Sequence, residues 1–147
     1  MKYFHELDST AIHDKLILLD VDGTLLADGE VELSTESLTA INALKRKNEV
    51  TLCSNKKDHV RNRAVAEQAD VGYVETNIRK PNVKILDFVV NEKDLDLLVI
   101  GDKYLTDDRF ARRIGAEFIK VRRKEKKGFG LYPFFYFIDD LLARIFT

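Results

Sequence analysis

The chain has 147 residues, 45% of them hydrophobic and 33% charged, which suffices for a single packed domain over residues 1–147 but not for two ordinary ones. Its 24 basic and 25 acidic residues nearly balance, so the overall charge gives no indication of nucleic-acid binding. A single cysteine excludes an internal disulfide framework, and residues 1–14 contain no apolar core of signal-peptide length. We therefore expect a cytoplasmic protein.

Short apolar runs alternate along the chain with segments of helical character. The runs predict strands at residues 15–21, 50–53, 73–74, 97–100 and 117–121. Strands that alternate with helices are typical of a parallel sheet with helices on both faces. The fold class predicted from the sequence is therefore α/β, with a three-layer α/β/α arrangement around a mainly parallel sheet.

Four segments between these strands are predicted to be helical. One begins at residues 33–36 and ends in the charged run 45–48, and polar helices are expected at 57–68 and 107–114. Another helix is expected to follow Pro81. The apolar positions that define the two more amphipathic helices are Leu38, Ile41 and Leu44 in the first, and Val83, Leu86 and Val90 in the one after Pro81.

The first strand ends in the motif Asp20-Val21-Asp22-Gly23-Thr24. Strand alternation sends Asp20 and Asp22 to the same side, at the carboxyl end of the sheet, where open α/β sheets bind their ligands. One carboxylate can then act as a nucleophile or metal ligand, and the other as a ligand or proton donor. The same Asp-Gly pair also fits an ordinary turn between apolar runs.

Further polar residues follow the later strands in an order that favours the ligand-binding interpretation. A hydroxyl and an amide close the second long strand, and a lysine stands before a proline at a predicted helix entrance. A carboxylate ends the strand at 97–100, and another follows in the next helical turn. These residues are Ser54 and Asn55, Lys80, Asp102 and Asp107, respectively.

This ordered set of motifs resembles the haloacid dehalogenase superfamily of phosphotransferases, and the resemblance extends from residue 15 to about residue 121. It implies a Rossmann-like core and a phosphomonoester hydrolase that depends on Mg²⁺. The implied roles are nucleophile for Asp20, general acid and base for Asp22, binding of phosphate or substrate for Ser54, Asn55 and Lys80, metal ligation for Asp20, Asp22 and Asp102, and a supporting acid at Asp107.

The implied chemistry explains why these residue types are needed together. A phosphate ester repels an attacking carboxylate, so Mg²⁺ and Lys80 must neutralise charge before the two can meet. Asp102, Asp20 and the backbone carbonyl of Asp22 would supply the oxygen ligands that Mg²⁺ prefers. Asp20 would form an aspartyl phosphate, while Asp22 would protonate the leaving oxygen and later deprotonate water.

Loop lengths predict that the site has no cap domain. Residues 23–33 have room for only a short flap, and residues 55–79 are already used by one helix and one short strand. An uncovered site admits a large or surface-bound substrate, or is covered by a neighbouring subunit.

The carboxyl-terminal residues suggest two uses for such an open site. Residues 122–127 form a basic run, and 131–147 can form an amphipathic helix with an aromatic face that is too short to span a bilayer. This composition is typical of a peripheral membrane contact. It also fits a helix that packs on the sheet or on a partner subunit.

Three functions therefore remain open from the sequence. Ser54-Asn55, Arg61, Lys80-Pro81, Gly101-Asp102 and Thr106-Asp107 together look like the capless branch that includes phosphatidylglycerophosphate phosphatases, which implies a lipid phosphate as substrate. The alternatives are a soluble sugar-phosphate phosphatase that acts as a homo-oligomer, and a binding protein that retains the fold without turnover.

Two other residue types were considered as site residues. Cys53 is expected to be a small buried strand residue, because no obvious base accompanies it. The three histidines are too dispersed to form a metal cluster, and only His59 lies near a motif. His59 is expected either to contact substrate or to occupy an exposed helix position.

Overall fold

The computed structural model describes residues 1–125. Within them, five strands form one sheet in the order β3-β2-β1-β4-β5, and every neighbouring pair is parallel. This confirms the predicted α/β fold with its parallel sheet. The amphipathic helix predicted at 131–147 lies outside the described residues. The strands are β1 (Lys15–Leu19), β2 (Glu49–Leu52), β3 (Gly72–Tyr73), β4 (Asp96–Gly101) and β5 (Glu117–Lys120).

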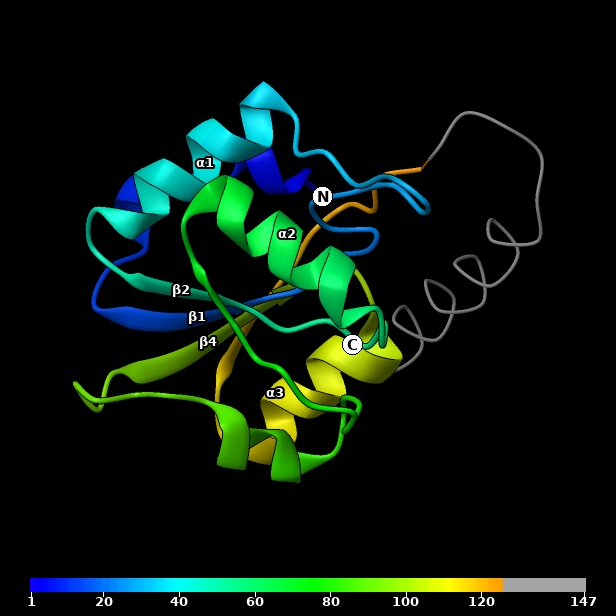
Figure 1. Ribbon diagram of the computed structural model, residues 1–147. Helices are drawn as coiled ribbons and strands as arrows, with labels where there is room; N and C mark the ends of the chain where they lie inside the picture. Colours follow the sequence, from blue (N-terminus) through cyan, green and yellow to red (C-terminus); the bar gives the residue numbers. More distant parts are fainter. Residues whose placement is uncertain (126–147) are drawn as a thin grey trace.

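Helices cover both faces of the sheet, as Figure 1 shows. Helices α1 (Thr35–Lys45) and α2 (His59–Ala69) lie on one face. The other face carries α3 (Arg109–Ile114) and the 3₁₀ helix η3 (Val83–Phe88). Two short 3₁₀ helices, Phe4–Glu6 and Ser9–Ala11, pack against α1.

Strand alternation in β1 divides the apolar core into two clusters. Ile17 and Leu19 belong to the cluster under α1 and α2, whereas Leu18 belongs to the cluster under η3 and α3. All three side chains are fully buried, and each contributes about 1.5–3 kcal/mol through removal of apolar surface from water. The central strand that carries the first motif is therefore held firmly from both sides.

The prediction of an α-helix after Pro81 is wrong, both in the type of helix and in the side chains that it buries. The segment forms the 3₁₀ helix η3, whose N-cap Asn82 accepts a hydrogen bond from the backbone N–H of Lys84. Its buried side chain is Ile85, while Val83 and Val90 are 46% and 69% exposed. A 3₁₀ helix repeats every three residues, so the α-helical spacing of the sequence does not describe it.

The helix predicted at 107–114 begins earlier than expected and in a different form. A π-helical turn covers Tyr104–Asp108, and α3 continues from Arg109 to Ile114, where Gly115 ends it with a positive φ of 71°. Single π-helical turns are frequent at functional sites. Asp107 therefore lies on a wider turn than an ordinary α-helix would give it.

The chain order of the strands places a crevice between β1 and β4. From β1 the chain moves outward through β2 and β3 to one edge, and it then returns to β4 on the other side of β1. Ligands of open α/β sheets bind at the carboxyl ends of the strands at such a switch point. Asp20 follows β1 and Asp102 follows β4, so both lie at this position.

Candidate active site

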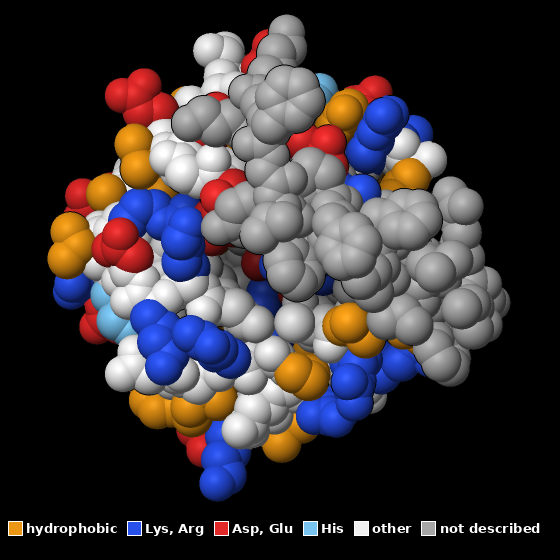
Figure 2. Space-filling view, turned by 90° about the vertical axis from the view of Figure 1, so that its right-hand side faces the viewer, with side chains coloured by type: hydrophobic (Ala, Val, Ile, Leu, Met, Phe, Trp, Pro, Cys, Tyr) orange, Lys and Arg blue, Asp and Glu red, His pale blue; other side chains and the backbone are white. Residues whose placement is uncertain are grey.

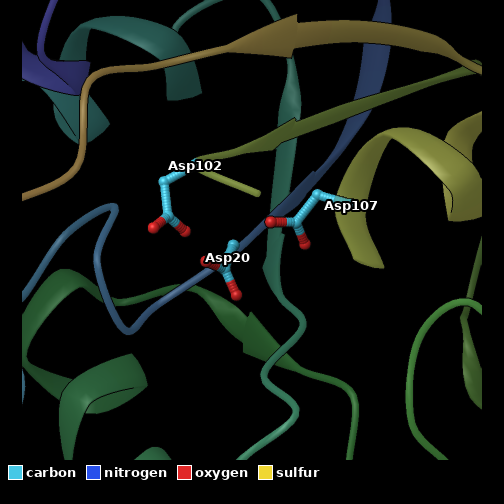
Figure 3. A group of neighbouring side chains, drawn as sticks. All are labelled: Asp20, Asp102 and Asp107. Carbon is cyan, nitrogen blue, oxygen red and sulfur yellow. The ribbon is translucent and has the colours of Figure 1, made fainter. Parts of the chain in front are cut away.

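Three buried carboxylates meet at the switch point. Asp20 comes from the end of β1, Asp102 from the end of β4 and Asp107 from the π-helical turn before α3. Figure 3 shows their carboxyl groups directed into one common space. One oxygen atom from each lies within 4.8 Å of the others. The structure thus brings together two predicted metal ligands and the predicted supporting acid.

Lys80 lies in the same cluster and is almost completely buried. Its Nζ donates hydrogen bonds to Oδ1 of Asp20 at 2.9 Å and to Oδ1 of Asp107 at 2.7 Å. Three carboxylates and one ammonium leave two negative charges when all four groups are ionised. A divalent cation carries the charge that would neutralise them.

Burial and mutual repulsion set the pKa values of the two later acids. Burial, followed by the charges of Asp20 and Asp107, raises the pKa of Asp102 to about 9. Burial and the charge of Asp20 raise the pKa of Asp107 to about 6, although the Lys80 ammonium opposes this rise. At neutral pH and without a cation, the cluster therefore retains a proton on Asp102.

The pKa values of Asp20 and Lys80 both shift in the direction that favours the ionised form. Burial alone would raise the pKa of Asp20, but the Lys80 ammonium and a hydrogen bond from Asp102 lower it below its ordinary value. Burial alone would lower the pKa of Lys80, but Asp107 and Asp20 together raise it well above its ordinary value. Asp20 is therefore a carboxylate and Lys80 an ammonium at neutral pH.

One oxygen of the cluster has no hydrogen-bond partner among residues 1–125. Oδ2 of Asp102 is buried and forms no hydrogen bond with any described residue. A buried carboxyl oxygen without a partner is costly, and the oxygens around it belong to other carboxyl groups, the ligands that Mg²⁺ prefers. The residues present therefore fit a divalent metal ion.

The side chain of Asp22 lies apart from this cluster. Its Oδ1 accepts a hydrogen bond from Nη1 of Arg61 at 3.0 Å, and its Oδ2 accepts one from Nη2 at 2.6 Å. Ser54 Oγ is 3.4 Å from the same carboxylate, so the two sequence-predicted residues are neighbours. The three carboxyl groups suited to a metal ion are those of Asp20, Asp102 and Asp107. Ligation by the Asp22 backbone carbonyl stays a prediction.

Asn55 contacts Lys80 through two hydrogen bonds. The backbone N–H of Lys80 donates to Oδ1 of Asn55 at 2.7 Å, and Nδ2 of Asn55 donates to the Lys80 carbonyl at 3.1 Å. Both polar atoms of the amide are therefore committed to the backbone of Lys80. The peptide bond between Lys80 and Pro81 is cis. Asn55 joins the loop after β2 to the residue that carries the buried ammonium.

Two contacts of the site were missed by sequence reasoning. Thr24 Oγ1 donates to Oδ2 of Asp20 at 3.1 Å, and it lies 3.4 Å from Oδ1 of Asp102. Its place four residues after Asp20 in the first motif was the available signal. Arg61 had been noted in the motif order, but no pattern linked it to Asp22, because the two residues are 39 positions apart.

Gly101 permits the close packing of Asp107 against β4. A Cβ atom at this position would lie 2.3 Å from Cγ of Asp107. Real Cβ atoms do not approach other heavy atoms this closely, so any side chain here would displace the carboxylate. The glycine before Asp102 therefore has a geometric role in the cluster.

Cys53 and His59 take structural positions near the site. Cys53 is buried as expected, and burial raises the pKa of its thiol to about 11. His59 is half-buried at the start of α2, with Nδ1 2.5 Å from the hydroxyl of Tyr73 and Nε2 2.8 Å from Oδ1 of Asn77. Its ring therefore joins α2 to β3 and the following loop.

The face that carries the carboxyl ends of the strands is shown in Figure 2. Acidic and basic side chains lie together in a recess of this face, and further Lys and Arg side chains lie around it. Basic side chains around an acidic recess attract anions to this face. In the described residues, no helix is long and apolar enough to cross a bilayer.

A family comparison matches the second half of the described chain. Residues 77–128 match the model of the HAD-hydrolase-like family. The matched segment contains Lys80, Asp102 and Asp107, which are three of the four charged groups in the buried cluster. The match agrees with the resemblance to the haloacid dehalogenase superfamily. No curated protein matches the chain.

Two solved structures are similar to part of this chain at low sequence identity. A chain of the Pnkp1/Rnl/Hen1 complex is 18% identical with a TM-score of 0.52, and the match covers 74% of this chain and 46% of that one. The HAD-hydrolase YfnB from Bacillus subtilis, solved with bound magnesium, is 15% identical with a TM-score of 0.49; that match covers 59% of this chain and 43% of YfnB. This chain thus spans less than half of either protein.

Proposed function

We propose that the protein is a Mg²⁺-dependent phosphomonoester hydrolase that works through an aspartyl phosphate on Asp20. The observation that carries the proposal is the buried cluster at the switch point, in which one carboxylate is paired with an ammonium beside two further acids. Phosphoryl transfer requires this combination of a nucleophile with charge neutralisation. The family match over residues 77–128 agrees with a hydrolase.

Asp20 is the nucleophile in this proposal. Its lowered pKa keeps it ionised, and hydrogen bonds from Lys80 and Thr24 hold its two oxygens in place. A carboxylate oxygen of Asp20 attacks phosphorus as the bond between phosphorus and the leaving oxygen breaks. Water then attacks the phosphorus of the aspartyl phosphate, which releases inorganic phosphate and restores the carboxylate.

Lys80 and the two later acids provide the electrostatic part of the mechanism. The buried ammonium of Lys80 lies beside Asp20, where it can stabilise negative charge on the transferring phosphoryl group. Asn55 positions Lys80 through the backbone, and Ser54 stands beside Asp22. Asp20, Asp102 and Asp107 would hold Mg²⁺, which supplies Lewis-acid neutralisation of the phosphate oxygens.

Asp22 is the general acid and base of the proposal. It donates a proton to the leaving oxygen in the first step and removes one from water in the second. Its carboxyl group is less buried than the metal-binding cluster, with a side chain that is 20% exposed. This partial exposure suits contact with a leaving group and with solvent water.

We further propose that the site is capless and that the substrate is a phosphate ester at an anionic lipid surface. Within the described residues, the loop between Asp22 and α1 contains only an isolated bridge from Asp22 to Leu26. The first part of the basic run lies beside this loop, because the backbone N–H of Lys124 donates to the Gly23 carbonyl at 2.7 Å. A basic segment fastened at the mouth of an open site would bring the site to an anionic surface.

The proposed activity is tested by Asp20→Asn and by a phosphoryl analogue. The purified wild-type protein should hydrolyse an aryl phosphate with Mg²⁺ and lose this activity in excess chelator. Asp20→Asn should be inactive but folded, since an amide is nearly isosteric and cannot attack phosphorus. Asp28→Asn, in the same loop, is the matched control and should retain activity.

A beryllium fluoride complex should attach to Asp20 of the wild-type protein in the presence of Mg²⁺. Turnover near the wild-type rate in Asp20→Asn would exclude the covalent mechanism. No hydrolysis of any phosphate ester by the wild-type protein, despite Mg²⁺ binding, would favour the binding-protein alternative.

The substrate class is tested by comparing one phosphomonoester head group on a lipid with the same head group free in solution. We expect higher kcat/KM for the lipid in anionic mixed micelles, with a dependence on salt that the free ester does not show. Equal kcat/KM for both, together with a homo-oligomer in solution, would instead support the soluble sugar-phosphate phosphatase.

A further inference from the structure

Arg61 and Asp22 form a two-point contact at the edge of the site. The guanidinium donates from Nη1 and Nη2 to the two oxygens of Asp22, at 3.0 and 2.6 Å. This end-on bidentate arrangement is stronger and geometrically more specific than a single hydrogen bond between an arginine and a carboxylate. It restrains both the position and the rotation of the carboxyl group, which a single hydrogen bond would not do.

The position of Arg61 is itself well determined. Arg61 is the third residue of α2, and its backbone N–H donates to the side chain of the N-cap Asp58 at 3.1 Å. Its side chain is only 9% exposed. The guanidinium therefore approaches Asp22 from a rigid helix and through a packed stem.

The other contacts of Asp22 are weaker. Ser54 Oγ lies at 3.4 Å, and Lys56 Nζ lies at 4.0 Å. Lys56 is also half exposed and lies 3.5 Å from Asp28, so it does not hold Asp22 alone. Among these neighbours, only Arg61 engages both carboxylate oxygens.

We infer that Arg61 is a positioning residue that holds the carboxyl group of Asp22 for proton transfer to the leaving oxygen. This inference rests on the proposed function. A group that binds the transferring phosphoryl would be expected beside Asp20, and Lys80 occupies that place. Both terminal nitrogens of Arg61 are instead engaged with Asp22, so Arg61 acts through Asp22.

If Arg61 has this role, the effect of its loss on the rate of Asp20 phosphorylation should depend on the leaving group. An alkoxide leaving group requires a proton in the transition state, so hydrolysis of an alkyl phosphate depends on a well-placed Asp22. A dinitrophenolate departs without a proton. Phosphorylation of Asp20 by dinitrophenyl phosphate therefore does not depend on the placement of Asp22. Loss of Arg61 should therefore slow the first step only for the alkyl ester.

The test measures the phosphorylation step in single turnovers with glycerol phosphate and with dinitrophenyl phosphate. For Arg61→Gln we expect a loss of about 10- to 100-fold with the alkyl ester, below the full 10²–10⁴-fold effect of general acid catalysis. The dinitrophenol burst should change by less than about 3-fold, with KM unchanged. Arg63→Gln is the matched control, because this arginine of the same helix pairs with Glu75 at the surface.

A double-mutant cycle with Asp22→Asn tests whether Arg61 acts through Asp22. In the Asp22→Asn background, Arg61→Gln should cause little further loss with the alkyl ester. Arg61→Lys keeps the charge but cannot engage both oxygens, so it should recover only part of the alkyl ester rate. It also provides a folded variant if Arg61→Gln is unstable.

Equal losses with both esters, a rise in KM alone, or additive losses in the cycle would each overturn the inference and indicate direct substrate binding by Arg61. These outcomes are distinct from failure of the proposed function. That failure would appear in the wild-type protein itself, as the absence of a dinitrophenol burst and of a beryllium fluoride adduct on Asp20.

Discussion

Replacing Asp102 by asparagine should stabilise the metal-free protein while weakening its response to Mg²⁺. The carboxyl group of Asp102 is buried against Asp20 and Asp107, and its pKa is raised to about 9. An unfolded chain ionises this residue with an ordinary pKa of 3.8. Folding at neutral pH in the absence of metal must therefore take up a proton, and asparagine removes that requirement.

The size of the effect follows from the difference between the pH and the unfolded pKa. Each pH unit corresponds to about 1.4 kcal/mol, so taking up the proton at pH 7 costs at most about 4 kcal/mol. Because the folded pKa is the higher one, the stability of the metal-free wild-type protein is lost as pH rises from about 3.8 to about 9. The advantage of Asp102→Asn should grow by about 1.4 kcal/mol per pH unit between pH 5 and 8.

Urea unfolding at pH 5, 6, 7 and 8, with chelator and with Mg²⁺, measures both parts of this expectation. The wild-type protein should gain about 2.7 kcal/mol when Mg²⁺ is present at 100 times its Kd, and Asp102→Asn should gain much less at the same concentration. Asp96→Asn, an exposed position on the same strand, is the control and should show neither effect.

Two results would refute the reasoning. A metal-free Asp102→Asn protein that is less stable than the wild type at pH 8 would show that the carboxyl group contributes favourable contacts instead of buried repulsion. A stability difference that does not change with pH would show that Asp102 titrates as an ordinary aspartate in the folded protein.

Two further substitutions test the same cluster, one through the stability of the metal-free protein and one through its affinity for Mg²⁺. Lys80→Met removes the ammonium that pairs with Asp20 and Asp107. It should therefore destabilise the metal-free protein by about 3–5 kcal/mol in urea unfolding. A loss below about 1 kcal/mol would show that these ion pairs are dispensable for stability. Gly101→Ala places a Cβ 2.3 Å from Cγ of Asp107, so it should raise the Kd for Mg²⁺ in calorimetric titrations. Gly72→Ala, on the edge strand, should leave that Kd unchanged.

The sequence predicted the parallel sheet because it follows from local patterns, whereas the grouping of Asp20 with Asp102 was implied by the family resemblance. The apolar run before Asp20 and the run before Asp102 are short, uninterrupted and bounded by polar residues, which is the pattern of a buried parallel strand. The carboxyl ends of neighbouring parallel strands lie at one edge, and because β1 and β4 are neighbours in the sheet, Asp20 and Asp102 meet there. Five strands in the described residues confirm this arrangement.

Features set by tertiary contacts could not be predicted in the same way. The spacing of Val83, Leu86 and Val90 suggested an α-helix, but the capping of Lys84 by Asn82 begins a 3₁₀ helix instead. Sequence spacing also gave no reason for Arg61 to contact Asp22, because that pair depends on how α2 lies across the end of β1. Pairings of this kind arise from packing between elements, which no local pattern encodes.

The metal-free cluster illustrates how the fold can maintain an unfavourable arrangement at its functional edge. In the described part of the chain, Asp20, Asp102 and Asp107 are buried together with the ammonium of Lys80, and Oδ2 of Asp102 has no hydrogen bond. The strands that carry the first two acids are buried in both core clusters, so apolar packing supplies the free energy that the charges oppose. A cation at this position would relieve the repulsion among the three carboxyl groups. Apolar packing of β1 and β4 thus holds these acids together at the end of the sheet, as a phosphoryl-transfer site with a divalent metal ion would require.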